Sequence, residues 1–489
     1  MPITDKEKRR MEKLVNKQKY VDKDFPLSPD EKNLKWKRPH EIVNKPELFV
    51  DGPSHMDIRQ HNLGDCWFLA AASVIAQHPH LINQVLPADQ YLYGKYYTGI
   101  LAFRFWNLGQ WTTVYIDDTL AVDEDDELHY GQCTTSNEFW LPLLEKAFAK
   151  YHGGYKNIEG GLSTEAMLIL TGYVTEDIVE PKLNEVQLYN MFSTAVQHNA
   201  LITVGSPTSS YEEGIVGYHV YSVTGVYSVE VGDSTVRLLR IRNPWGDIQD
   251  TIEWKGAFSD DDPKWTGVDT ETRKKLEYVK DEDGQFFMKV SHFKRHFTHF
   301  WMAYKSPNFG VTTFQQIYNF SNVWDKGIVV KGEGVEYADN FLRNPLYTLT
   351  VEEKAEEEES EYEIDLDEET VDESDDEDAT PPSYNVIIQL IQDQNRGKYR
   401  TEIYPIGISV FQTGGRYPNE LGPENLEEFE PHKGSVEPVV HGSIVARLNL
   451  RPGKYIVVPW VMIARMSRPF LMRVYALQRV TMEAVKREE

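Results

Sequence analysis

The chain has 489 residues, 40% of them hydrophobic, and a formal net charge of −26, and it carries no basic, aromatic-interleaved patch typical of nucleic-acid binding. Its length is enough for about three globular domains, and no stretch approaches the roughly 18 apolar residues of a membrane-spanning helix. The two cysteines, Cys66 and Cys133, allow no disulfide framework, and residues 1–10 lack the apolar segment of a signal peptide, so a cytoplasmic location is expected.

Residues 1–45 are expected to form an N-terminal arm that ends in an anchor at Trp36-Lys37-Arg38-Pro39. Within this arm, residues 6–19 are basic, but they include too few apolar side chains for a membrane-bound helix. The segment is therefore expected to be either a surface helix or a flexible arm.

Residues 46–178 are expected to form a mostly helical first lobe around the segment Gln60 to Trp67. Cys66 lies directly before Trp67 and the apolar run 68–76, which places its thiol in the first turn of a predicted buried helix. A helix N-terminus stabilises a thiolate, the reactive form of cysteine, although a free cysteine that only fills space is the alternative. A later stripe at helical spacing is assigned to the core of this lobe: Leu141, Leu144, Phe148 and Tyr151.

Strands dominate the expected second lobe, residues 179–305. His219 lies near the start of one predicted strand, and Asn243 ends another. Pro244 favours an extended Asn243, whose amide would then project from the strand end beneath Trp245. Taken singly, His219 would more often be a core histidine on a strand, and Asn243 would more often be a turn residue before proline.

Together these residues have the types and the order of a cysteine hydrolase. His219 follows Cys66 by 153 residues and Asn243 follows it by 177, which is the order and approximate separation found in papain-like enzymes. Such an enzyme needs a base for the thiol and a third group that orients the base. A transglutaminase uses similar chemistry but normally has aspartate in the third position, so Asn243 counts against it.

Residues 306–480 predict a β-sandwich, followed by a tail at 481–489. Short strands separated by turn residues are expected at 310–324, 345–350, 384–391, 399–410, 443–449, 455–458 and 470–477. Residues 352–378 interrupt this pattern with 18 acidic residues and one lysine, a net charge of −17 that leaves −9 for the rest of the chain. Because such a composition cannot bury a core, a solvated acidic loop is expected there.

Six segments of the chain resemble the calpain family of cysteine proteases: residues 35–39, 60–67, 138–147, 221–225, 240–246 and 450–459. The resemblance implies an α+β fold with a papain-like two-lobed cysteine protease core, one lobe helical and one β-rich, followed by a calpain-type β-sandwich domain. It assigns catalytic positions to five residues: Cys66 as nucleophile, His219 as acid and base, Asn243 as orienting residue, Gln60 as oxyanion donor, and Trp245. The family usually has glycine before the histidine, whereas this chain has Tyr218, which would crowd the cleft and alter substrate choice.

The resemblance also implies calcium as a regulatory cofactor, bound by one non-EF-hand loop in each lobe through carboxylate and carbonyl oxygens. The first-lobe ligands all match the family pattern: Val50, Gly52, Asp57 and Glu138. The second-lobe ligands would be Glu253, Asp260, Asp281, Asp283 and Gln285. The family has glutamate where Gln285 stands and arginine where His55 stands, so weaker binding at the second loop and altered coupling between the lobes are expected.

No segment has the form of an EF-hand loop, and the chain ends shortly after residue 459. It therefore resembles the atypical calpains without a penta-EF-hand domain, and no small regulatory subunit is implied. The predicted function is that of an intracellular, calcium-regulated cysteine endopeptidase that makes limited cuts in protein substrates. The alternative is a catalytically silent scaffold of calpain shape that binds partners or membrane through its β-sandwich, and peripheral membrane association is a candidate property in either case.

Overall fold

The computed structural model describes residues 2–15, 19–25, 27–179, 183–207, 213–232, 234–246, 253–305, 315–324, 344–353, 384–395, 403–414, 429, 431–462, 468–477 and 479–485. These residues belong to two compact units. The first comprises Met1–Tyr173, Asp177–Ala303 and Asn395–Thr401, and the second comprises Val174–Glu176, Tyr304–Gln394 and Glu402–Glu489. None of the described helices is long and apolar enough to cross a membrane.

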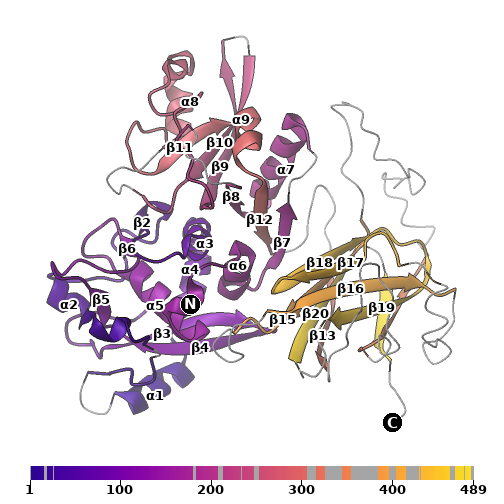
Figure 1. Cartoon of the computed structure of the whole chain (residues 1–489), viewed down its shortest axis with the longest axis horizontal. Helices are drawn as coiled ribbons and strands as arrows, with labels where there is room; N and C mark the ends of the chain where they lie inside the picture. The colour runs from indigo at the N-terminus through magenta and orange to yellow at the C-terminus, as the bar shows by residue number, and fades with distance from the viewer. Residues whose placement is uncertain are drawn as a thin grey trace. The chain divides into compact units, whose positions relative to one another are not determined.

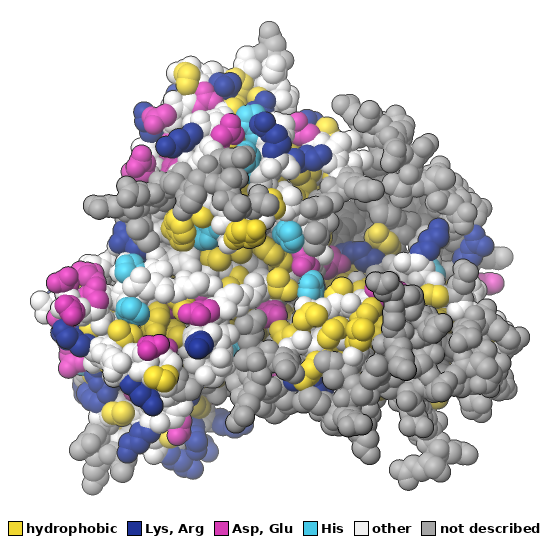
Figure 2. All heavy atoms as spheres, viewed as in Figure 1, with side chains coloured by type: hydrophobic (Ala, Val, Ile, Leu, Met, Phe, Trp, Pro, Cys, Tyr) yellow, Lys and Arg dark blue, Asp and Glu magenta, His cyan; other side chains and the backbone are white. Residues whose placement is uncertain are grey.

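The N-terminal arm begins with helix α1 (Asp5–Leu14), which resolves the choice between a helix and a flexible arm in favour of the helix. Lys and Arg side chains gather over this helix in Figure 2. Its Glu7 forms a buried ion pair of 2.5 Å with Arg104. The predicted anchor lies on β1 (Lys35–Lys37), which pairs antiparallel with β5 (Leu120–Val122) and so attaches the arm to the first lobe.

The first lobe is built around the predicted helix, α3 (Cys66–Ala76), all of whose residues after Cys66 are buried. Helix α6 (Ser163–Thr171) packs against it, as does α4 (Pro79–Val85) (Figure 1). The predicted core stripe lies on α5 (Trp140–His152) and is buried throughout. The remaining short elements of this lobe and its arm are η1 (Glu31–Asn33), α2 (Pro39–Ile42), η2 (His55–Asp57), β2 (Ile58–Arg59), β6 (Gln132–Cys133) and η3 (Tyr155–Ile158).

The first lobe also contains a β-hairpin that the sequence pattern did not predict. Strands β3 (Ile100–Asn107) and β4 (Gln110–Asp117) pair antiparallel. The two residues that connect them, Leu108 and Gly109, both have positive φ, as a tight type I′ turn requires. Seven of the eight residues of β3 are buried, so this strand lacks the alternating pattern by which strands are predicted.

The second lobe is a six-stranded sheet with the order β11-β10-β9-β8-β12-β7 (Figure 1). Its strands are β7 (Val174–Val179), β8 (Leu201–Gly205), β9 (Val220–Val231), β10 (Ser234–Arg242), β11 (Gln285–Lys289) and β12 (His299–Tyr304). Its helices are α7 (Glu185–Gln197), η4 (Pro263–Gly267), α8 (Thr270–Lys275) and α9 (Val290–His296). Strand β7 starts at Val174, a few residues before the expected lobe boundary at 179. Because β9 and β10 are antiparallel neighbours, the start of β9 and the end of β10 meet at one edge of the sheet.

The second unit is a β-sandwich, as predicted. One sheet has the order β13-β20-β15-β18 and the other β17-β16-β19-β14-β21, with an apolar core between them. The strands are β13 (Gln315–Trp324), β14 (Tyr347–Val351), β15 (Val386–Gln392), β16 (Pro405–Gln412), β17 (Val436–Val440), β18 (Ser443–Leu448), β19 (Gly453–Val461), β20 (Arg468–Ala476) and β21 (Val480–Ala484). The seven predicted strands are confirmed and β17 and β21 are additional; β21 runs beyond residue 480, where the tail was expected to begin. The predicted acidic loop lies outside the described residues from position 354 on.

Candidate active site

Cys66 is the first residue of α3 and is partly exposed, unlike the rest of that helix. Its thiol lies against the second lobe, where the backbone amide of Val220 donates to Sγ. Burial raises the pKa of the thiol to about 11; the Val220 amide opposes this rise and the charge of Asp65 adds to it. The thiol is therefore protonated at neutral pH in this arrangement.

His219 immediately precedes β9, and Asn243 immediately follows β10, so the meeting of these strand ends brings the two side chains together. Nε2 of His219 lies 2.8 Å from Oδ1 of Asn243, which is fully buried. The same Oδ1 accepts from the backbone amide of Trp245 at 3.0 Å, which identifies it as the amide oxygen. Nε2 of His219 must then donate, and Nδ1 is the basic ring nitrogen.

Trp245 covers this hydrogen bond, with its ring centroid 4.9 Å from that of His219. Burial lowers the pKa of His219 to about 4, although the bond to Asn243 acts in the opposite direction. The buried site thus favours a neutral imidazole as well as a neutral thiol. A thiolate–imidazolium pair can form here only where the two charges stabilise each other, because the hydrogen bonds from Val220 and to Asn243 offset only part of the cost of burial.

Gln60 is buried on the loop that leads to Cys66. Its side-chain nitrogen donates to the carbonyl oxygen of Leu63 at 2.7 Å and, at 3.4 Å, to Oδ1 of Asp65. Its backbone amide donates to the carbonyl oxygen of Pro244 at 2.8 Å, which links the two lobes beside the nucleophile. The structure therefore brings all five predicted catalytic residues to one place, where the lobes meet. Hydrophobic and histidine side chains gather in a band at this level in Figure 2.

Arg242 is a residue of this site that the sequence interpretation missed. Its side chain donates to the carbonyl oxygens of Met56 (3.0 Å) and Ile58 (3.1 Å) in the first lobe. It also donates to the carbonyl oxygen of Asp283 (2.9 Å) in the second lobe. One buried guanidinium next to Asn243 thus connects both lobes. Little in the sequence signals this role, because the same strand also carries Arg237 and Arg240 and nothing in the pattern singles out Arg242.

The proposed calcium ligands of the first lobe lie together. Oε1 of Glu138 accepts from the backbone amide of Val50 at 2.8 Å, whereas its buried Oε2 has no hydrogen-bond partner among the described residues. Burial raises the pKa of Glu138 to about 7, and the charges of Asp57 and Asp51 raise it further. Gly52, in the same loop, has a φ of +94° that favours glycine. An unpaired buried carboxylate oxygen beside a second acid fits a hard divalent cation.

Asp57 is more fully engaged than Glu138. Its Oδ2 accepts from the backbone amide of Ser54 at 2.7 Å and from Nε1 of Trp140 at 3.1 Å. These donors fix the carboxylate, but burial still raises its pKa. Within the described ranges, no three His, Cys, Asp or Glu side chains lie close enough together to hold a metal ion. The first-lobe residues therefore fit calcium by type and burial, with backbone carbonyls needed to complete the set.

Four of the second-lobe ligands also lie together. Oε1 of Glu253 accepts from the backbone amide of Gly284 at 2.6 Å, and Oδ2 of Asp260 accepts from that of Asp281 at 3.2 Å. Burial raises the pKa of Glu253 to about 8 and that of Asp260 to about 7, and each acid is also affected by the charge of Asp283. These mutually repelling acids are of the type that a cation would stabilise.

The side chain of Gln285 does not join these acids, although its backbone amide donates to Oδ1 of Asp283 at 2.7 Å. Its Oε1 lies 3.0 Å from Nε2 of His55 in the first lobe and accepts from Oγ1 of Thr224 at 3.3 Å. Burial lowers the pKa of His55 to about 4, and the nearby charge of Arg242 lowers it further. The two positions at which this chain departs from the calpain pattern thus form an uncharged hydrogen bond between the lobes.

Tyr218 is the third departure, and it is held in an unusual backbone conformation. Its φ is +50°, in the left-handed region, and 75% of its surface is exposed. This conformation costs a residue with a Cβ about 1 kcal/mol or more, whereas glycine adopts it freely. An exposed aromatic ring therefore lies directly before His219 at a position that favours glycine.

Comparison with known protein families gives two matches that together cover most of the chain. Residues 14–303 match the model of the calpain family cysteine protease. Residues 320–475 match the model of domain III of the calpain large subunit. The first match covers the two-lobed unit, and the second covers the β-sandwich.

Several curated proteins are similar to the chain over nearly its whole length. Calpain-A of Drosophila melanogaster is 33% identical over 94% of this chain and 54% of its own length. Calpain-12 of Homo sapiens is 34% identical, covering 93% of this chain and 64% of itself. Calpain-8 of Rattus norvegicus is 32% identical, covering 92% of this chain and 63% of its own length. The chain thus spans between half and two-thirds of the length of these relatives.

Replacement of Arg242 should weaken both the fold and the lobe contact. Arg242→Met is expected to lower the free energy of unfolding by about 3 kcal/mol, because three buried carbonyl oxygens lose a charged donor. Thermal and denaturant unfolding measure this loss. The control is Arg237→Met on the same strand, whose guanidinium lies over the ring of Tyr189 instead. Equal losses in the two variants would contradict a special role for Arg242.

Replacement of Tyr218 separates the effect of its ring from that of its backbone. Tyr218→Gly removes both ring and strain, whereas Tyr218→Ala removes only the ring. If the ring contacts substrate, both variants should change KM for a peptide substrate in the same direction, with stability altered by less than about 1 kcal/mol. Steady-state kinetics and thermal unfolding measure these quantities. A change in KM with glycine alone would assign the effect to the backbone.

Proposed function

The chain belongs to the calpain family of cysteine proteases, and we propose that it is an intracellular endopeptidase that makes limited cuts in protein substrates under calcium control. The observation that carries this proposal is the Cys66 thiol on the N-terminus of α3, which accepts from the backbone amide of Val220. The preceding residue, His219, is oriented by Asn243 beneath Trp245. The two free cysteines agree with a reducing, cytoplasmic environment. The silent-scaffold alternative is less favoured because an inactive descendant commonly loses a catalytic residue and none is lost here.

The geometry supports acyl transfer in two steps. Nδ1 of His219 takes the thiol proton, and the Cys66 sulfur attacks the substrate carbonyl carbon. The backbone amide of Cys66 stabilises the oxyanion, and the side-chain amide of Gln60 would supply the second donor by turning one N–H from the carbonyl oxygen of Leu63. Protonated His219 then gives its proton to the leaving amine, which leaves a thioester on Cys66. Neutral His219 activates a water molecule that hydrolyses this ester and restores the thiol.

Asn243 and Trp245 act on the base rather than on the substrate. The 2.8 Å bond from Nε2 to Asn243 fixes the ring orientation and the tautomer that leaves Nδ1 basic. Trp245 shields this bond from water, which keeps it strong in a local environment of low dielectric constant.

We assign calcium binding to the two acidic loops. The first would use Asp57, Glu138 and the backbone oxygens of Val50 and Gly52, and the second would use the acids around Glu253. Bound calcium would supply positive charge that stabilises the ionised form of these buried carboxylates. Because the carbonyl groups of Met56, Ile58 and Asp283 all accept from Arg242, a shift of either loop would be transmitted to the strand end that carries Asn243.

The nucleophile can be tested with the two cysteines of the chain. Cys66→Ser should lower the hydrolysis of casein by at least about three orders of magnitude, because the hydroxyl does not ionise beside an imidazole. It should also abolish labelling by an epoxide-type thiol inhibitor. Cys133→Ala is the control. Because Cys133 is buried in the first lobe, this variant should keep both casein hydrolysis and labelling by the inhibitor. Measurements across a calcium titration test regulation at the same time. Absence of hydrolysis and labelling in the unmodified protein at every calcium concentration would favour the scaffold.

The two calcium loops should respond differently to substitution. Asp57→Ala is expected to weaken calcium binding at the first loop at least about tenfold. Gln285→Glu should instead tighten binding at the second loop, because a carboxylate that turns from His55 toward Asp283 adds a charged oxygen to the loop; the backbone amide of Gln285 already donates to Oδ1 of Asp283. Isothermal titration calorimetry on the full chain measures both affinities. Glu271→Gln, which removes an exposed acid of the second lobe, is the control. Two sites of equal, tight affinity in the unmodified protein would contradict the expectation that Gln285 weakens calcium binding at the second loop.

A further inference from the structure

Two carboxyl groups lie buried together directly behind the nucleophile, and the steps described above do not use them. Asp65 immediately precedes Cys66, and Glu145 lies on α5; both residues have an exposure of 0%. Their side chains are hydrogen-bonded to each other. Two carboxylates offer acceptors only, so this bond requires a proton on one of them.

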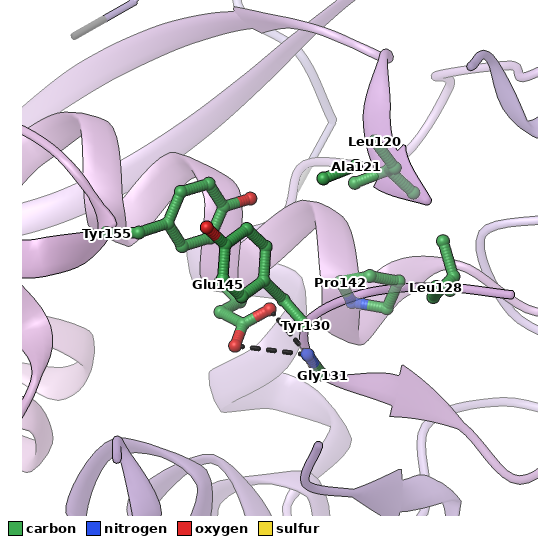
Figure 3. Close-up of a pocket in the computed structure, with 8 residues that line it drawn as sticks. All are labelled: Leu120, Ala121, Leu128, Tyr130, Gly131, Pro142, Glu145 and Tyr155. Carbon is green, nitrogen blue, oxygen red and sulfur yellow. Dashed lines mark hydrogen bonds between the residues drawn. The ribbon is translucent and has the colours of Figure 1, made fainter. Parts of the chain in front are cut away.

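The surroundings of the pair supply hydrogen-bond donors but no described cation. Apart from the Cys66 thiol beside Asp65, the titratable groups that act on the pair or on its neighbouring phenols are themselves acids or phenols. They are Tyr130, Tyr155, Glu31 and Glu159. The rings of Tyr130 and Tyr155 stack at 3.9 Å in the small pocket beside Glu145, whose other wall is apolar (Figure 3). Lys146, the next residue of α5, pairs with Asp117 instead. A second negative charge at this place would therefore be uncompensated.

The pair holds three chain segments in fixed positions. Oδ1 of Asp65 lies 3.4 Å from the side-chain nitrogen of Gln60, and its backbone oxygen accepts from Phe68 and Leu69 in the first turn of α3. The carboxyl oxygens of Glu145 accept from the backbone amide of Gly131 at 2.9 and 3.2 Å. No other donor among the described residues reaches Oδ2 of Asp65, which leaves the carboxyl group of Glu145 to supply its hydrogen bond.

We propose that Asp65 and Glu145 share a single proton and that this pair positions the loop from Gln60 to Cys66 for catalysis. The positioning role rests on the proposed proteolytic function, whereas the shared proton does not. The proton resides on Glu145 and the negative charge on Asp65, where the side-chain amide of Gln60 stabilises it. Both are positioning residues, because neither touches the reacting atoms.

The shared proton has a defined effect on stability. Burial raises the pKa of both carboxyl groups, and that of Glu145 rises well above its usual range. An unfolded glutamate ionises near about pH 4.3, so at neutral pH the folded chain holds a proton that the unfolded chain does not. The stability that Glu145 contributes is therefore complete below that pH and declines as the pH rises toward its folded pKa.

The first experiment replaces the proton donor with an isostere. Glu145→Gln keeps a donor toward Asp65 and an acceptor for Gly131, so the fold should be retained. Difference infrared spectroscopy at neutral pH should show the carbonyl band of a protonated carboxylic acid in the unmodified protein and lose it in this variant. The unmodified protein should also release one more proton on unfolding than Glu145→Gln does. Glu159→Gln, at an exposed acid near Tyr130, is the matched control and should keep both signals.

The second experiment uses Asp65, whose charge raises the pKa of the Cys66 thiol. Asp65→Asn moves the negative charge to Glu145, away from the sulfur. The rate of Cys66 alkylation by iodoacetamide should then reach its half-maximum at lower pH than in the unmodified protein. In Glu145→Gln the charge stays on Asp65 and the alkylation profile should not move. Asp65→Ala removes the acceptor for Gln60 and should lower kcat about tenfold with KM little changed, and Asp65→Asn should rescue most of that loss.

The outcomes separate this inference from the proposed function, because the infrared, proton-release and alkylation measurements need no proteolysis. The carboxylic acid band without any proteolysis would support the shared proton and refute the enzyme. Proteolysis without the band, or with the band still present in Glu145→Gln, would refute the shared proton. Equal shifts of the alkylation profile in Asp65→Asn and Glu145→Gln would refute the placement of the charge on Asp65. If Asp65→Asn left kcat as low as Asp65→Ala does, the positioning role would be refuted.

Discussion

The hydrogen bonds of Arg242 are the interaction on which the geometry of the site depends. The guanidinium reaches carbonyl groups on both sides of Asp57 and a third beside the second acidic loop, while the next residue, Asn243, holds His219. An arginine suits this place because it offers several donors in a rigid fork and stays charged when buried. Together with the bond from Gln60 to Pro244, this one side chain therefore fixes the end of β10 against the first lobe and ties it to both acidic loops.

The charge of Arg242 also explains why the neighbouring link between the lobes is neutral. The bond from His55 to Gln285 lies close enough to Arg242 for its charge to lower the pKa of His55. A second cation at position 55 would repel the guanidinium unless an acid at position 285 compensated it. The paired departures from the family pattern thus keep a lobe contact without adding charge, and a neutral contact is little affected by salt.

The sequence predicted those parts of the molecule in which local pattern and chemistry agree. The α3 helix, the order of Cys66, His219 and Asn243, and seven strands of the sandwich carry clear signals of periodicity or residue type. The hairpin of β3 and β4 was missed because a strand buried on both faces has no alternation, and β17 because it is short, largely exposed and contains proline. Arg242 and the Asp65–Glu145 pair could not be found, because their roles come from contacts between segments far apart in the chain.

Burial assembles this site and at the same time opposes the charges that its chemistry needs. It raises the pKa of Cys66 and lowers that of His219, so each group alone is neutral when the lobes are in contact. It also raises the pKa of Glu138 and Glu253, the acids expected to bind a cation. In each case only a compensating charge favours ionisation, whether from the partner in the ion pair or from a bound cation. Reactivity in this fold therefore depends on how closely opposite charges are placed, because desolvation by burial otherwise favours the neutral forms, and this makes the contact between the lobes the controlling variable.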